Sequence, residues 1–366
     1  MRVHEPSDIH DAAVSHFEKL FSDASSTPIL TTSMLSFVTK SITLAQASDL
    51  TRPVSDEEIK NVVFHMKPGK APGPDGFSAD FFQKSWQLVG ADVTAAVSSF
   101  FRSGKLLKEL NHTSLTLVPK ISNPTKLKDF RPIACCNFIY KCISGILAAR
   151  LKGILSSIID GAQAAFIQGR SMSDNIFLAQ ELLHNYHRPA TKSCCAIKVD
   201  LLKAYDMVKW SFLLDLLYKM GFPSRFIKWI RECITTPKFS ININGELIGF
   251  FGATRGLRQG DPLSPYLFAI IMDALSMLIH KKIEEEVLAG NPFEYHWRCK
   301  KTKLSHLCFA DDLMLFCGGS ISSVDLLHRA LQEFCSLSGL LPNKEKSNIF
   351  IAGNNSRYIE AVGEIF

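Results

Sequence analysis

Two adjacent aspartates stand between two apolar runs in the stretch LSHLCFADDLMLFC, residues 304–317. Each run has the length of a β-strand, and the polar pair falls where a tight turn would join the two strands. The pattern therefore predicts a β-hairpin with Asp311 and Asp312 at its tip. Two carboxylates about 4 Å apart repel by roughly 4 kcal/mol at an effective dielectric of about 20, and a proton or a bound hard cation such as Mg2+ offsets that repulsion. Aspartate is also common in turns, so a polar turn without a ligand is the alternative interpretation.

A third acid, Asp200, follows the apolar run CCAIKV at residues 194–199, which predicts another strand. Asp200 precedes Asp311 by 111 residues, so only long-range strand pairing can bring these acids together. Carboxylates grouped at the end of a sheet are the ligand set for two-metal phosphoryl transfer, in which the ions lie about 3.5–4 Å apart. The nearby His306 is interpreted as a packed strand residue rather than a metal ligand.

The chain has an ordinary globular composition, with 46% hydrophobic and 21% charged residues in a length of 366. Its net charge of +6 does not by itself identify a nucleic-acid partner, but seven basic residues stand against one acid between Lys120 and Lys152. The ten cysteines form no C-x-x-C pair, which favours buried thiols in a reducing compartment over disulfides or zinc. No signal-peptide core is present at the N-terminus, and no apolar run reaches the roughly 18 residues of a membrane span.

Periodicity and capping residues predict most helices and strands. Ser55 and Ser211 are expected to cap helices, and Asn244-Gly245 is expected to form the type I′ turn of a hairpin. The weakly patterned residues 22–53 are interpreted as a loose connection. The stretch KPGKAPGPDGF, residues 67–77, is either a linker or an ordered loop whose lysines and amides face phosphates. Further helices are expected at residues 10–21, 79–101, 140–158 with a basic face, 174–186, 266–279 and 325–337, and further strands at 114–120 and 348–352.

Six motifs, taken together and in order, resemble the reverse transcriptase of plant LINE-type (non-LTR) retrotransposons. They are KPGKAPGPDG at 67–76, DFRPI at 129–133, the Gln163 to Ile176 segment, DLLKAYD at 200–206, RQGDPLSP at 258–265 and FADD at 309–312. The resemblance extends from about residue 55 to residue 352. It implies an α+β fold, a right-hand polymerase whose fingers and palm are built on a small antiparallel sheet with helices packed behind it.

The resemblance also implies a division of the chain. Residues 1–54 would be an N-terminal helical or loose extension, 55–113 the LINE-type N-terminal extension of the polymerase, 114–353 the fingers and palm, and 354–366 the start of a thumb region. The expected protein is truncated, without an endonuclease, a complete thumb or a ribonuclease H domain. It would be intracellular, nuclear or cytoplasmic.

The implied activity is RNA-directed DNA polymerisation, with two Mg2+ ions, or Mn2+ in their place, and with template RNA, DNA primer and dNTPs as partners. No membrane and no obligate protein partner is expected. A catalytically decayed or repurposed nucleic-acid-binding protein of the same fold is the alternative. Two departures from the family pattern are Leu202, where a polar residue is more usual, and Leu341-Pro342 before the lysine segment.

Carried over by position, the family's functional residues fall on thirteen positions. The metal ligands would be Asp200, Asp311, Asp312 and the carbonyl of Leu201, with Lys346 protonating pyrophosphate; nucleotide contacts would come from Lys120, Arg131, Tyr205, Gln259 and Gly260, and nucleic-acid contacts from Lys67, Lys70 and Arg170. Tyr205 stands where the family has an aromatic ring under the deoxyribose, and Asp206 beside it is interpreted as structural.

Overall fold

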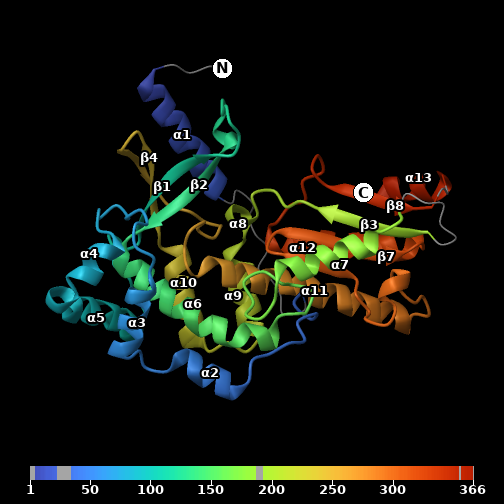
Figure 1. The fold of residues 1–366 in the computed structure, drawn as a ribbon, viewed down its shortest axis with the longest axis horizontal. Coiled ribbons are helices and arrows are strands. Elements are labelled where there is room, and N and C mark those ends of the chain that lie inside the picture. Colours follow the sequence, from blue (N-terminus) through green and yellow to red (C-terminus); the bar gives the residue numbers. More distant parts are fainter. Residues whose placement is uncertain (1–4, 23–33, 187–192, 354–355, 366) are drawn as a thin grey trace. The chain divides into compact units, whose positions relative to one another are not determined.

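A computed structural model of the chain describes residues 5–22, 34–186, 193–353 and 356–365 (Figure 1). These residues form two compact units. Unit 1 contains the described residues up to 22 together with 42–154 and 205–265, and unit 2 contains 34–41, 155–204 and 266–365 apart from the gaps. Within the described residues, no helix combines the length and the apolar character needed to cross a membrane.

Unit 1 contains a four-stranded mixed sheet in the order β2-β1-β4-β5. Strand β1 (His112–Pro119) pairs antiparallel with β2 (Phe130–Cys136) and parallel with β4 (Lys238–Ile243), which forms a hairpin with β5 (Glu246–Phe251). Asn244 and Gly245 join the hairpin with φ angles of 53° and 91°. Positive φ at both positions is what a type I′ turn requires, so the predicted hairpin turn is confirmed.

The helices of unit 1 differ from the prediction in several places. They are α1 (Pro6–Phe21), α2 (Leu44–Thr51), α3 (Asp56–His65), α4 (Ala79–Lys84), α5 (Trp86–Ser103), the first part of α6 (Phe138–Ile158), most of α8 (Ala204–Met207), α9 (Trp210–Lys219) and α10 (Ser224–Thr235). Ser55 caps α3 as predicted, because its Oγ accepts a hydrogen bond from Glu58 N at 3.1 Å. The prediction of a loose connection over 22–53 was wrong for α2, which a Thr43–Gln46 capping box begins. Lys209, not Ser211, is the N-cap of α9.

The predicted basic face of α6 is also wrong at Arg150, whose side chain is 1% exposed. Its guanidinium makes two hydrogen bonds to Glu58, with Nε–Oε1 at 3.0 Å and Nη2–Oε2 at 2.8 Å. Nη1 donates to the carbonyls of Leu50 and Arg52. Arg150 therefore ties α6 to α3 and to the end of α2, and it does not contribute to a basic surface.

Unit 2 contains a four-stranded antiparallel sheet in the order β6-β7-β3-β8. Its strands are β6 (His306–Phe309), β7 (Asp312–Gly318), β3 (Cys194–Val199) and β8 (Asn348–Ala352). The hairpin predicted around the aspartate pair and the strand predicted before Asp200 are therefore confirmed. So is the mixed helix-and-sheet fold class.

Helices cover both faces of the unit 2 sheet. Helix α7 (Met172–Leu183) packs Leu182 against Ala196, Leu307 and Phe316 on one face. On the other face, Nε2 of His306 and the hydroxyl of Ser276 share a hydrogen bond of 2.7 Å. Ser276 belongs to α11 (Ser264–Leu288). The remaining helices of the unit are α12 (Ile321–Ser338) and α13 (Ser356–Ile365), so α11 and α12 both extend beyond their predicted ranges.

Candidate active site

The hairpin tip of β6 and β7 exposes the two adjacent acids. Phe309 pairs with Asp312, so Ala310 and Asp311 form the connection, and both acids are exposed. Ala310 has a φ of 54°, in the left-handed region that costs an alanine roughly 1–2 kcal/mol. A non-glycine residue keeps that conformation only where surrounding contacts fix it.

Those contacts come from Gln163, which is 1% exposed. Its Oε1 accepts hydrogen bonds from the backbone N–H of Ala165 at 2.9 Å and of Ala310 at 3.2 Å. The backbone beside it also joins β6, because Ala164 N donates to Cys308 O at 3.1 Å and Cys308 N donates to Ala162 O at 2.8 Å. Sequence reasoning included Gln163 in a motif but gave it no role.

Asp200 lies at the same end of the unit 2 sheet as the acid pair. Val199, the last residue of β3, pairs antiparallel with Leu313 of β7. Asp200, which follows Val199, and Asp312, which precedes Leu313, are therefore at the same end of the two strands. The sheet thus brings to one end the three acids that the sequence separates. Asp200 is half-buried, and its carboxylate Oδ2 accepts a hydrogen bond from Asn343 Nδ2 at 3.0 Å.

Leu201 directly follows Asp200, and its pairing partner Pro342 leads into the turn that contains Lys346. Leu201 forms an isolated antiparallel bridge with Pro342, and Leu202 N donates to Leu341 O at 2.8 Å. The Leu341-Pro342 departure from the family pattern is therefore a pairing segment for the chain after Asp200. Lys346 is exposed in the turn that follows, where its N–H donates to Asn343 O at 3.2 Å.

The carboxylates of Asp200, Asp311 and Asp312 suit a hard divalent cation, because such ions prefer oxygen ligands. Their position at one strand end also fits such an ion. In the described part of the chain, however, no three His, Cys, Asp or Glu side chains are gathered closely enough to form a coordination shell. The three carboxylates therefore have the donor atoms that a divalent ion prefers and lie at one end of the sheet. Among the described residues they do not form a preformed coordination shell.

Two basic residues predicted to bind triphosphate lie at one end of the β1–β2 ladder in unit 1. Both Lys120 and Arg131 are exposed. Arg131 of β2 pairs with Val118 of β1, and Lys120, which directly follows β1, donates its N–H to Asp129 O at 2.8 Å. Lys120 Nζ also donates to Lys128 O at 3.1 Å.

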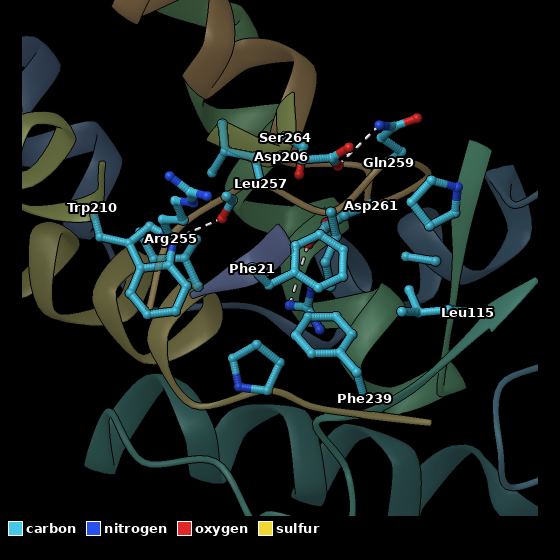
Figure 2. A pocket seen from close by; sticks show the side chains of 16 residues that line it. Phe21, Leu115, Asp206, Trp210, Phe239, Arg255, Leu257, Gln259, Asp261 and Ser264 are labelled. Carbon is cyan, nitrogen blue, oxygen red and sulfur yellow. Dashed lines mark hydrogen bonds and ion pairs between the residues drawn. The ribbon is translucent and has the colours of Figure 1, made fainter. Parts of the chain in front are cut away.

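Gln259, Gly260 and Tyr205 belong to a second set of contacts in unit 1, and Figure 2 shows Gln259 beside its partner Asp206. Gln259 Nε2 donates to Asp206 Oδ1 at 3.0 Å, and Leu257 N donates to Tyr205 O at 2.7 Å. Gly260 has a φ of 109°, and a Cβ there would lie 3.0 Å from Ala134 O, which explains the glycine. Asp206 is 3% exposed and held by Gln259, in agreement with its structural interpretation.

Sequence reasoning missed the buried role of Arg258 in the same motif. Its guanidinium stacks 3.8 Å from the Tyr140 ring and lies 3.3 Å from Asp261 Oδ2. Nη1 donates to Asn111 at 2.8 Å, and the Tyr140 hydroxyl donates to Asp261. Burial raises the pKa of Tyr140 and keeps this hydroxyl a donor. The only sequence signal was the Arg and Asp spacing of three within one loop.

The Pro- and Gly-rich stretch at 67–77 is an ordered loop and not a linker. A Cβ on Gly73 would overlap Asn137 Oδ1, and that oxygen accepts a hydrogen bond from Asp75 N at 3.1 Å. Lys67, Lys70 and other residues of unit 1 line a cavity of about 480 Å3 beside this loop. Their predicted contact with nucleic acid stays a prediction.

Arg170, the third residue predicted to contact nucleic acid, binds the backbone of unit 2. Its Nη1 donates to the carbonyls of Asp160 and Gln163, the latter at 2.6 Å, and its Nη2 donates to Ile159 O at 2.8 Å. These contacts hold Arg170 against the backbone around Gln163, and its predicted contact with nucleic acid stays a prediction.

Comparison with known proteins identifies relatives of the chain. Residues 118–362 match the family described as reverse transcriptase (RNA-dependent DNA polymerase). The chain is 27% identical over 286 residues to the "Transposon TX1 uncharacterized 149 kDa protein" of Xenopus laevis, covering 78% of the chain and 22% of that protein. It is 28% identical over 277 residues to the "Retrovirus-related Pol polyprotein from type-2 retrotransposable element R2DM" of Drosophila melanogaster, covering 75% of the chain and 24% of that protein. It is 27% identical over 294 residues to the "Retrovirus-related Pol polyprotein from type-1 retrotransposable element R2" of Nasonia vitripennis, covering 79% of the chain and 26% of that protein. The chain thus spans about a quarter of the length of these relatives.

Proposed function

Because the chain belongs to the reverse transcriptase (RNA-dependent DNA polymerase) family, we propose that it adds deoxynucleotides to the 3′-hydroxyl of a primer paired with an RNA template. The observation that carries the proposal is the position of Asp200, Asp311 and Asp312 at one end of the unit 2 sheet. The named relatives come from a transposon and from retrotransposable elements, and we propose a non-LTR retrotransposon, of LINE type and from a plant, as the source of this domain.

We propose that the unit 2 sheet is the palm of a right-hand polymerase and that the β1–β2 hairpin belongs to the fingers. The antiparallel pairing of the unit 2 sheet supports the first assignment. The exposed Arg131 on β2 and the exposed Lys120 directly after β1 support the second. The family pattern then gives residues 55–113 as an N-terminal extension and 114–353 as fingers and palm.

Asp200, Asp311 and Asp312, with the carbonyl of Leu201, would hold two Mg2+ ions, or Mn2+ in their place. When bound, the ions lower the pKa of the attacking 3′-hydroxyl and stabilise the charge that builds on phosphorus and pyrophosphate. The protein's own contribution is to hold the acids at one place. Gln163 fixes the turn between Phe309 and Asp312 through Ala310.

The remaining residues would bind and orient the substrates. Lys120 and Arg131 would bind the triphosphate, for which a guanidinium supplies two parallel donors. Tyr205 would pack against the deoxyribose, Gln259 and Gly260 would lie against nucleotide and template, and Lys346 would donate a proton to the leaving pyrophosphate. Lys67 and Lys70 of the ordered loop would contact nucleic-acid phosphates.

The test is extension of a labelled DNA primer on an RNA template with dNTPs and Mg2+, beside measurement of duplex binding by the same preparation. Template-dependent extension is the expected result. Binding of the duplex without extension would support the alternative, a repurposed nucleic-acid-binding protein. A failure to bind and to extend would contradict both.

A further inference from the structure

The turn from Asn343 to Ser347 contacts Asp200 on three of its polar groups. Asn343 N donates to Asp200 O at 2.7 Å, and Asn343 Nδ2 donates to Asp200 Oδ2 at 3.0 Å. Asp200 N donates to Ser347 Oγ at 3.2 Å, and that hydroxyl donates to Asn343 O at 2.7 Å. Both backbone groups and one carboxylate oxygen of Asp200 are therefore bound by one short turn.

The chemistry of the Asn343 side chain suits a residue that orients a metal ligand. An ionised carboxylate only accepts hydrogen bonds, so the amide must present Nδ2 to it. A neutral donor fixes the carboxylate without cancelling its charge, whereas a lysine or arginine would compete with a cation. The contact occupies Oδ2 and leaves Oδ1 of Asp200 outside this hydrogen bond.

We propose that Asn343 is a positioning residue for metal binding by Asp200. Its amide holds the carboxylate in one orientation at the end of β3, and the backbone of the turn and Ser347 hold the main chain of Asp200 in place. The inference rests on the proposed function, because it requires Asp200 to ligate a divalent ion. Residues that hydrogen-bond a ligating carboxylate typically change metal affinity or activity by about 10- to 100-fold when they are replaced.

Asn348 offers a matched control on the next strand. Its Nδ2 donates to Lys346 O at 3.1 Å, so it supports the same turn from outside and makes no side-chain hydrogen bond to Asp200. Asn343→Ala removes the donor, and Asn343→Leu removes it while keeping the volume. Both are compared with Asn348→Ala, with Asp200→Asn and with the unmodified chain.

The experiment measures Mn2+ binding to the full chain by the electron paramagnetic resonance signal of free Mn2+, without nucleic acid or nucleotide. The thermal midpoint of each metal-free variant is measured in parallel. We expect both Asn343 variants to weaken Mn2+ binding by about 10- to 100-fold, with Asn348→Ala within about twofold of the unmodified chain. The Mg2+ concentration for half-maximal nucleotide addition should rise by a similar factor.

Three results would overturn the inference, and they differ from one another. Unchanged Mn2+ affinity in both Asn343 variants, with weakened binding in Asp200→Asn, would show that Asp200 ligates metal without help from Asn343. A loss of affinity that follows a matching fall in the metal-free thermal midpoint would show a structural role only. Unchanged affinity in Asp200→Asn would remove the metal assignment itself, and with it this part of the proposed function.

Discussion

The side-chain oxygen of Gln163 accepts a hydrogen bond from the backbone N–H of Ala310 at 3.2 Å, across 147 residues of sequence. Ala310 is the left-handed residue that immediately precedes the first acid of the exposed pair. The same oxygen binds Ala165 N at 2.9 Å, so one amide joins the 163–165 segment to the hairpin tip. The conformation of the tip thus depends on a residue outside the hairpin.

Replacing Gln163 with leucine should lower the rate of nucleotide addition and destabilise unit 2. The change removes the acceptor for two N–H groups, and each buried group left without a partner costs about 1–3 kcal/mol. Single-turnover addition and urea unfolding would be measured for Gln163→Leu. Gln332→Leu on α12 is the matched control, because that exposed side chain shares a hydrogen bond with His328 one turn away on the same helix. Equal rates in the two variants would contradict the role of Gln163.

His306 should make stability depend on pH. Burial lowers its pKa to about 4, although Asp160 opposes the shift, and its ring lies between the hydroxyls of Ser276 and Ser305. Below about pH 6.5 the unfolded chain takes up a proton that the folded chain does not, so the folded state loses stability as pH falls toward about 4. The total loss is roughly 3 kcal/mol at 1.36 kcal/mol per pKa unit.

Urea unfolding between pH 8 and pH 4.5 tests this prediction by comparing the unmodified chain with His306→Gln. The variant should be less stable at pH 8, because it loses packing, but its stability should fall less between pH 6.5 and pH 4.5. Parallel curves for the two proteins over this range would show that His306 is not the group responsible.

Lys120→Ala and Arg131→Ala should each raise the KM for the incoming nucleotide. Loss of a phosphate contact formed equally in the ground and transition states raises KM alone, and kcat falls as well if the contact tightens during the reaction. Steady-state kinetics would be compared with those of Lys128→Ala, a lysine of the same hairpin whose carbonyl, which the substitution keeps, accepts a hydrogen bond from Lys120 Nζ. Weaker RNA affinity with an unchanged nucleotide KM would place the two residues on the template instead.

Tyr205→Val should raise ribonucleotide incorporation relative to deoxyribonucleotide incorporation. A ring packed under the sugar leaves no room for a 2′-hydroxyl, and valine would remove that obstruction. The ratio of kcat/KM for the two nucleotide types is the measurement, with Tyr218→Val, at an exposed tyrosine of α9, as the control. Lower stability with an unchanged ratio would show that Tyr205 has only a packing role.

Local patterns predicted the elements that depend on neighbouring residues. The apolar runs around Asp311 predicted the hairpin, and Asn244-Gly245 predicted a turn with two positive φ angles. The parts that sequence reasoning missed depend on distant partners. Arg150 looked like a surface charge because Glu58, which neutralises it, lies 92 residues away.

The same limit applies to the candidate site. The three acids were recognised from motifs, and strand pairing in unit 2 brings them to one end of a sheet. Asn343 lies 143 residues from Asp200, and no periodicity or spacing connects such positions. Residues that orient a site become visible only when the chain is folded.

RNA-templated primer extension by Asp311→Asn and Asp200→Asn tests the central claim most directly. Asparagine keeps the shape of aspartate but removes the charge that binds and tunes metal ions. Asp325→Asn on α12 is the control, because Asp325 pairs with Arg329 on the helix surface. We expect each of the first two variants to lose at least about 100-fold in the rate of nucleotide addition with unchanged thermal midpoints, and the control to extend primers normally. Extension by either variant at the rate of the unmodified chain would contradict the assignment of these acids as the catalytic centre.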